Sequence, residues 1–90
     1  MPIKVIEFKI LDGHRINVHF SNGMFGTHDL ASLDFGKGPM SEPLREEGYF
    51  RRAFVEFGAL TWPNGFDISP EWLRREMEAA GELHYAKAAE

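Results

Sequence analysis

The chain has 90 residues, of which 43% are apolar and 13% aromatic, enough for one domain with a single core. Its formal net charge is −4, which gives no general attraction to nucleic acid or anionic membranes. The absence of cysteine excludes disulfides and thiolate chemistry, and no segment approaches the ~20 apolar residues of a membrane span. We therefore expect a cytoplasmic protein with one domain at residues 1–80 and a C-terminal tail at 81–90.

The first predicted element is a strand at residues 3–10, where apolar and polar side chains alternate. The alternation places Ile6 and Phe8 on one apolar face. A two-residue turn into the next alternating run would mix apolar and polar faces. A three-residue loop ending at a left-handed Gly13 instead sets Phe8 opposite Ile16 and keeps the apolar side chains together, so we predict this loop.

The second predicted strand, residues 15–20, is followed by the dipeptide Asn22-Gly23. This dipeptide is typical of a two-residue type I′ turn, whose central residues both need positive φ. The turn pairs Phe20 with Phe25 on the apolar face. The result is a three-stranded meander with one apolar face and one polar face.

The same pairing sets His19 and His28 together on the polar face of the meander. Two imidazoles on neighbouring strands are weak candidates for a metal site, because zinc takes three or more protein ligands and Arg15 nearby disfavours a cation. The alternation favours an ordinary solvated face. We therefore expect neither a metal nor another cofactor.

Shorter elements follow the meander. We expect helical turns at residues 29–33 and 41–46, with Ser41 as a cap, and an exposed Gly- and Pro-rich loop between them at 35–39. Two further runs, residues 50–57 and 59–62, are predicted to pair as a C-terminal hairpin that turns at a glycine.

One convincing helix is predicted from Pro70 to about Ala80. Ser69 is a favourable N-cap and Pro70 suits the first helical position, while Leu73, Met77 and Ala80 form the face expected to be buried. The tail beyond Gly81 is expected to fray or to continue as helix. The fold class is therefore α+β, with an antiparallel sheet of about five strands and one C-terminal helix.

Two arginine pairs are the basic doublets of the chain. Arg51 and Arg52 are flanked by aromatic residues, and Arg74 and Arg75 lie in the predicted helix. Arginines interleaved with aromatic residues bind single-stranded nucleic acid in some proteins. On a strand, however, the same pattern points aromatic rings to the core and arginines to water, which is the favoured interpretation. Contact with nucleic acid through these four residues is kept as the alternative.

Two motifs resemble a bacterial family of unknown function, the one numbered 2442, over about residues 3–75. One motif is Val18–Gly23, and the other is Trp62–Pro70. The family positions in the second motif are Trp62, Asn64, Gly65, Asp67 and Pro70. The resemblance implies a small α+β domain rather than an activity. Members often stand beside a second small family, numbered 4160, which implies a two-gene pair of the toxin–antitoxin kind.

The second motif also has a structural interpretation, which we favour over a recognition surface. Trp62 is suited to anchoring a strand in the core, Asn64-Gly65 to forming a turn, and Asp67 to a place just ahead of the helix.

No catalytic constellation, phosphate-binding loop or nucleophile motif is found in the sequence. We expect a non-enzymatic protein-interaction module that binds a protein partner or a second copy of itself. The alternatives are a nucleic-acid-binding or regulatory accessory protein and, less favoured, a small metal-dependent enzyme.

Overall fold

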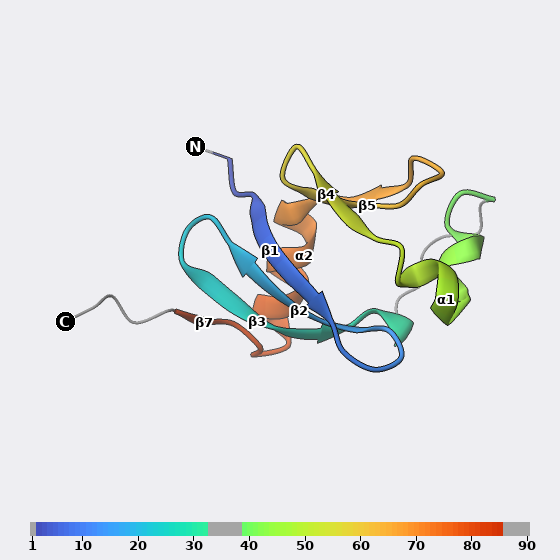
Figure 1. Ribbon diagram of the computed structural model, residues 1–90. Helices are drawn as coiled ribbons and strands as arrows, with labels where there is room; N and C mark the ends of the chain where they lie inside the picture. The colour runs from blue at the N-terminus through green and yellow to red at the C-terminus, as the bar shows by residue number, and fades with distance from the viewer. Residues whose placement is uncertain (1, 33–38, 86–90) are drawn as a thin grey trace.

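The computed structural model describes residues 2–32 and 39–85 of the chain. Its elements in chain order are β1 (Val5–Ile10), β2 (Arg15–Phe20), β3 (Met24–Asp29), η1 (Leu30–Ser32), η2 (Glu42–Arg45), α1 (Glu47–Phe50), β4 (Phe54–Glu56), β5 (Ala59–Thr61), β6 (Asp67–Ile68), α2 (Pro70–Ala79) and β7 (His84–Tyr85). The strands form two antiparallel sheets, ordered β1-β2-β3-β7 and β4-β5-β6 (Figure 1). The predicted α+β class is confirmed, although β6 and β7 were not predicted and the strands divide between two sheets.

The hydrophobic core is shared by the inner face of the four-stranded sheet, helix α2 behind it and the smaller sheet (Figure 1). Its buried side chains are Ile3, Val5, Ile16, Val18, Phe20, Leu30, Leu44, Phe50, Leu60, Trp62, Ile68, Leu73 and Met77. In the described parts of the chain, no helix combines the length and the apolar character needed to span a bilayer.

Strand β1 pairs with β2 in a register two residues from the predicted one. Phe8 lies opposite Val18, not opposite Ile16. Because side chains alternate with a period of two, this shift leaves Phe8 and Ile10 on the predicted face, together with the apolar residues of β2. Gly13 adopts the expected left-handed conformation, with φ 57°. From Phe8 onward the prediction was therefore correct in faces and wrong in register.

A β-bulge at the start of β1 overturns the prediction for Ile6. The register shifts between Val5 and Glu7, so β1 has one extra residue here relative to β2. Val5 is buried at 1% exposure, whereas Ile6 is 64% exposed. The simple alternation from Ile6 to Phe8 therefore fails at the bulge.

The loop between β2 and β3 has three residues, 21–23, rather than the predicted two. The Gly23 N–H donates to the Phe20 carbonyl at 3.1 Å, and Gly23 has a φ of 91°, which is the geometry of a type I turn followed by a left-handed bulge residue. Asn22 has no positive φ, and its Oδ1 accepts the Met24 N–H at 3.1 Å.

One extra loop residue moves every β3 side chain to the opposite face, so the predicted pairing of Phe20 with Phe25 is wrong. Phe25 lies opposite His19, and His28 lies opposite Ile16. His28 is buried on the core side, with 8% exposed. His19 and His28, which were predicted to share a face, therefore lie on opposite faces of the sheet.

The strand predicted at 50–57 is shorter, because a helical turn precedes it. The Phe50 N–H donates to the Glu46 carbonyl at 2.9 Å and the Arg51 N–H to the Glu47 carbonyl at 3.1 Å, the spacing of an α-helix. Phe50 thus reaches the core from α1, and the strand β4 begins only four residues later.

The predicted helical turns at 29–33 and 41–46 are found as η1 and η2. Ser41 stands at the N-cap of η2, but its side chain makes no capping hydrogen bond there, contrary to the prediction. Residues 33–38, which hold most of the predicted exposed loop, lie outside the described residues, as do residues 86–90 of the predicted tail.

Helix α2 begins as predicted, with Ser69 Oγ accepting a backbone N–H of the first turn at 3.2 Å and Pro70 at the start. Leu73 and Met77 are buried as expected, but Ala80 at the C-cap is exposed. It stands past the last helical turn, where the chain leaves the core.

The segment after α2 is not the predicted frayed or helical tail. The chain turns at Gly81, with φ 72°, and residues 82–85, which we call the C-terminal strap, run back to pair with β3. Gly26 lies so close beneath the strap that a Cβ there would overlap the Glu82 carbonyl oxygen. The strap can therefore pack against β3 only because residue 26 has no Cβ.

Candidate functional site

Trp62 is an internal anchor. Trp62 is 1% exposed, and its indole N–H donates to the Phe50 carbonyl at 2.9 Å. The rings of Phe50 and Phe66 lie 5.6 Å and 6.1 Å from it. The structure thus places Trp62 inside the core, and its one polar atom is satisfied there.

Asn64 joins the loop after β5 to two other segments. Its Nδ2 donates to the Met40 carbonyl at 2.8 Å, its backbone N–H donates to the Tyr49 hydroxyl at 2.9 Å, and its Oδ1 accepts the Phe66 N–H at 3.1 Å. Gly65 supplies the left-handed residue of this turn, with φ 93°. These two motif positions have a structural role.

The remaining motif positions frame the start of α2. Asp67 pairs with Thr61 in the small sheet and is exposed to solvent, and Pro70 occupies the first turn of the helix. The described residues hold no cluster of three or more His, Asp or Glu side chains placed to bind a metal ion.

The two arginine doublets do not form one surface, because α1 and α2 lie in different parts of the molecule (Figure 1). Arg51 donates to the Leu11 carbonyl at 3.1 Å, and the Arg52 guanidinium lies 5.6 Å from the centre of the Tyr49 ring. Arg74 forms ion pairs with Glu71 and Glu78 at 3.6 Å and 2.8 Å, and Arg75 is exposed. Three of the four arginines are thus engaged within the fold.

The two candidate histidines have separate environments. His28 Nδ1 lies 2.5 Å from Glu82 Oε1 of the C-terminal strap, and its buried Nε2 has no hydrogen-bond partner among the described residues. His19 stacks on Phe25 on the outer face, with ring centres 5.2 Å apart and planes 13° from parallel. The two side chains do not converge on a common ligand.

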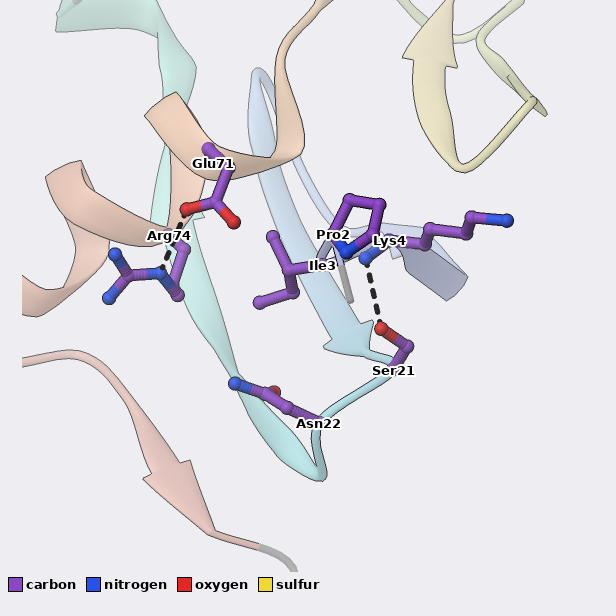
Figure 2. Close-up of a pocket in the computed structure, with 7 residues that line it drawn as sticks. All are labelled: Pro2, Ile3, Lys4, Ser21, Asn22, Glu71 and Arg74. Atoms are coloured by element: carbon purple, nitrogen blue, oxygen red, sulfur yellow. Dashed lines mark hydrogen bonds and ion pairs between the residues drawn. The ribbon is translucent and has the colours of Figure 1, made fainter.

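A hollow of about 610 Å³, open to solvent, lies between the N-terminal segment and α2 (Figure 2). It is lined by Pro2, Ile3, Lys4, Ser21, Asn22, Glu71 and Arg74, and we call it the Lys4 hollow. Figure 2 shows the Lys4 and Arg74 side chains pointing in different directions, so their charges do not converge as they would around an anion. Its accessible lining is mainly apolar.

The most unusual residue of the structure is Phe57, at the turn between β4 and β5. Glu56 pairs directly with Ala59, so the turn has two residues, Phe57 and Gly58, with φ values of 53° and 81°. Asn or Asp is favoured at the first position of this type I′ turn, because a left-handed φ crowds the Cβ of most side chains. Phe57 is the one non-glycine residue with positive φ in the described parts of the chain.

Phe57 is also 94% exposed, more than any other large apolar residue described. Burial of the Phe57 ring therefore contributes almost nothing to the stability of the fold, although the backbone of this residue is strained. Sequence reasoning assigned the turn to Gly58 and missed Phe57. The available signal was a Phe-Gly pair standing where a two-residue hairpin turn favours Asn-Gly.

Other exposed apolar side chains lie on β1 and β4, the two strands beside this turn. The Val5 N–H donates to the Gly58 carbonyl at 2.8 Å, which holds β1 against the hairpin, and both β1 and β4 are edge strands of their sheets. Exposed fractions in this group range from 37% to 94%. We call it the apolar rim, and it consists of Ile6, Phe54, Val55 and Phe57.

Replacing Phe57 with Asn is expected to raise the free energy of unfolding by about 1 kcal/mol, because Asn tolerates the left-handed turn and little burial is lost. Urea unfolding followed by circular dichroism measures this change. Phe57→Ala serves as the control, because Ala removes the ring without relieving the strain. A lower stability of Phe57→Asn would show that the ring supports the fold.

Comparison with known proteins identifies the family. The model of the family described as "Protein of unknown function (DUF2442)" matches residues 5–79, so the chain belongs to this family. The match includes both motifs noted in the sequence and ends before the C-terminal strap. No curated protein and no solved structure matches the chain.

Proposed function

We propose that this member of the DUF2442 family is a non-enzymatic protein-interaction module, and that it contacts another protein chain through the apolar rim. The observation that carries the proposal is Phe57, a 94% exposed aromatic residue held at a φ of 53°. A residue that is both strained and unburied is accounted for by a contact made outside its own fold.

The surroundings of Phe57 support the same function. Phe54, Val55 and Ile6 are further exposed apolar side chains on the strands beside the turn, and aromatic residues are enriched in protein interfaces. The neighbouring edge strands β1 and β4 carry backbone groups suited to pairing with an added strand. The partner in this proposal is either a second copy of the chain or the product of a paired gene.

Protein is a better candidate for the partner than nucleic acid. The formal net charge is −4, and the arginine doublets stand in separate parts of the molecule, so no basic stripe accompanies the aromatic residues of the rim.

Photo-cross-linking in cells of the source organism tests this function. A photoreactive benzoylphenylalanine is placed at position 57 of the full chain, and the matched control carries it at position 12, which is also exposed and lies on the β1–β2 loop away from the hairpin (Figure 1). We expect a discrete cross-linked product from position 57, with its mass identifying the partner. If position 57 yields no more product than position 12, the proposed contact is absent.

A further inference from the structure

We infer that the C-terminal strap occupies a peptide-binding site on β3, and that an extended segment with a carboxylate at the position of Glu82 binds the same site when the strap leaves it. We call this the β3 edge site, and it consists of Met24, Phe25, Gly26 and His28. It lies at the opposite edge of the four-stranded sheet from β1. The inference therefore goes beyond the contact proposed for the apolar rim and does not depend on it.

Gly26 provides the space for a second backbone. A Cβ at this residue would overlap the Glu82 carbonyl group and crowd the end of the Met77 side chain. Close approach of one backbone to another is a characteristic use of glycine within a strand. The backbone of an extended segment can therefore lie directly against β3 at this position.

His28 provides the polar group that recognises the strap. The residue is 8% exposed, and its Nδ1 lies 2.5 Å from Glu82 Oε1. Because a carboxylate only accepts hydrogen bonds, Nδ1 carries the proton and donates it. The Nε2 atom of this ring is buried and has no hydrogen-bond partner among the described residues. Without the Glu82 carboxylate both ring nitrogens would lack a partner, which is unfavourable for a buried polar group, so the site favours a carboxylate here.

The remaining contacts of the strap are those of an added β-strand. Tyr85 pairs with Met24 and His84 with Phe25, and the rings of His84 and Phe25 lie 5.6 Å apart. Figure 1 shows β7 beside β3 at the edge of the sheet. Main-chain pairing along a sheet edge, combined with specific recognition of a side chain, is a common way in which proteins bind extended peptides.

Few contacts hold the strap in this site. The two residues of β7 are exposed, and within the strap only Leu83 is among the apolar side chains that pack against the core. Segments with few buried contacts open at a small cost in free energy. The Glu82 N–H donates to the Met77 carbonyl at 2.9 Å, which keeps the strap beside the site. The family match at residues 5–79 includes the whole β3 edge site, whereas the strap lies beyond it.

The attached strap competes with any free segment for the β3 edge site. A segment joined by a short linker acts at an effective concentration in the millimolar range. A free peptide therefore binds the wild type weakly. Replacing Glu82 with Ala weakens the competitor, because it removes the carboxylate that His28 contacts.

Nuclear magnetic resonance of the ¹⁵N-labelled, full-length Glu82→Ala chain tests the site, with an unlabelled peptide of residues 80–85 as the probe. We expect the peptide to shift the backbone amide signals of Phe25, Gly26 and His28. We also expect it to bind the variant with a dissociation constant at least about 10-fold lower than that of the wild type, because a hydrogen bond to a charged group no longer holds the strap.

Two matched controls accompany this titration. Glu78→Ala removes a carboxylate from α2 that pairs with Arg74 rather than with His28, and it is expected to bind the peptide as the wild type does. A peptide with the Glu82→Gln replacement keeps the shape of the side chain without its charge. It is expected to bind the Glu82→Ala chain at least about 10-fold more weakly than the probe.

Three results would overturn the inference. If millimolar peptide leaves the Phe25, Gly26 and His28 signals of Glu82→Ala unchanged, β3 has no such site. If the two peptides bind equally, the site does not recognise a carboxylate. If the wild type binds the probe as tightly as Glu82→Ala, the strap does not compete for the site. None of these results alters the cross-link expected from position 57, so this inference and the proposed function fail separately.

Discussion

Replacement of Trp62 with Ala is expected to lower the free energy of unfolding by about 3–5 kcal/mol, the usual cost of emptying a buried aromatic site. The indole is 1% exposed and stands between the rings of Phe50 and Phe66. The variant also leaves the Phe50 carbonyl without the donor that now lies 2.9 Å away. Because whole domains are stable by only about 5–15 kcal/mol, this is a large share of the total.

Urea unfolding followed by far-UV circular dichroism measures the loss. Trp62→Phe is the companion variant, because it keeps an aromatic ring but has no N–H for the Phe50 carbonyl, and its expected cost is smaller, about 1–3 kcal/mol. Wild-type stability of Trp62→Ala would contradict the structural interpretation of the Trp62–Pro70 motif.

The second large effect is expected at Gly26. A methyl group in Gly26→Ala would overlap the Glu82 carbonyl and press on the Met77 side chain, so the C-terminal strap must move away from the sheet. Displacement of the strap also separates His28 from Glu82 and β7 from β3. We expect a loss of about 1–3 kcal/mol, the range found when a packed core is overfilled.

Hydrogen exchange distinguishes strap release from general destabilisation. In Gly26→Ala, the backbone amides of residues 84–85 are expected to lose protection before those of β1 and β2. Gly48→Ala is the matched control, because a Cβ at Gly48 meets nothing within 4 Å and Ala favours the helical conformation of α1. Unchanged protection of the strap in Gly26→Ala would contradict the close packing seen at this position.

Much of the three-stranded meander could be predicted. The alternation of apolar and polar residues determines which face of the sheet each side chain occupies, but it determines less strongly which residues lie opposite each other. The register between β1 and β2 was wrong by two residues, and such a shift leaves each side chain on its face. The error between β2 and β3 was one residue, which reverses the faces. Asn22-Gly23 is compatible with either loop length, and the burial of His28 depends on Glu82, 54 residues away. The sequence around His28 gives no indication that it pairs with Glu82.

The strap and the small sheet illustrate the same limit. β6 and β7 have only two residues each, too few for any periodic pattern, and both exist because a neighbouring strand provides hydrogen bonds. Helix α2, in contrast, was predicted closely because its cap and its first-turn proline are local signals.

The candidate site was largely missed by sequence reasoning for a physical reason. The motif residues that attract notice, above all Trp62 and Asn64, are occupied in holding the fold together. Phe57 reads in the sequence as one more apolar strand residue, and only the two-residue turn shows that it is exposed and strained.

The central claim, that Phe57 serves contact rather than folding, is tested most directly by measuring two properties of the Phe57→Asn variant side by side. One is its free energy of unfolding, and the other is the mass of the complex that the tagged chain forms in an extract of its source organism. We expect the wild type to run above its monomer mass and the variant to run as a monomer, while the variant is at least as stable in urea. A variant that keeps the complex, or that loses stability together with the complex, would contradict this claim.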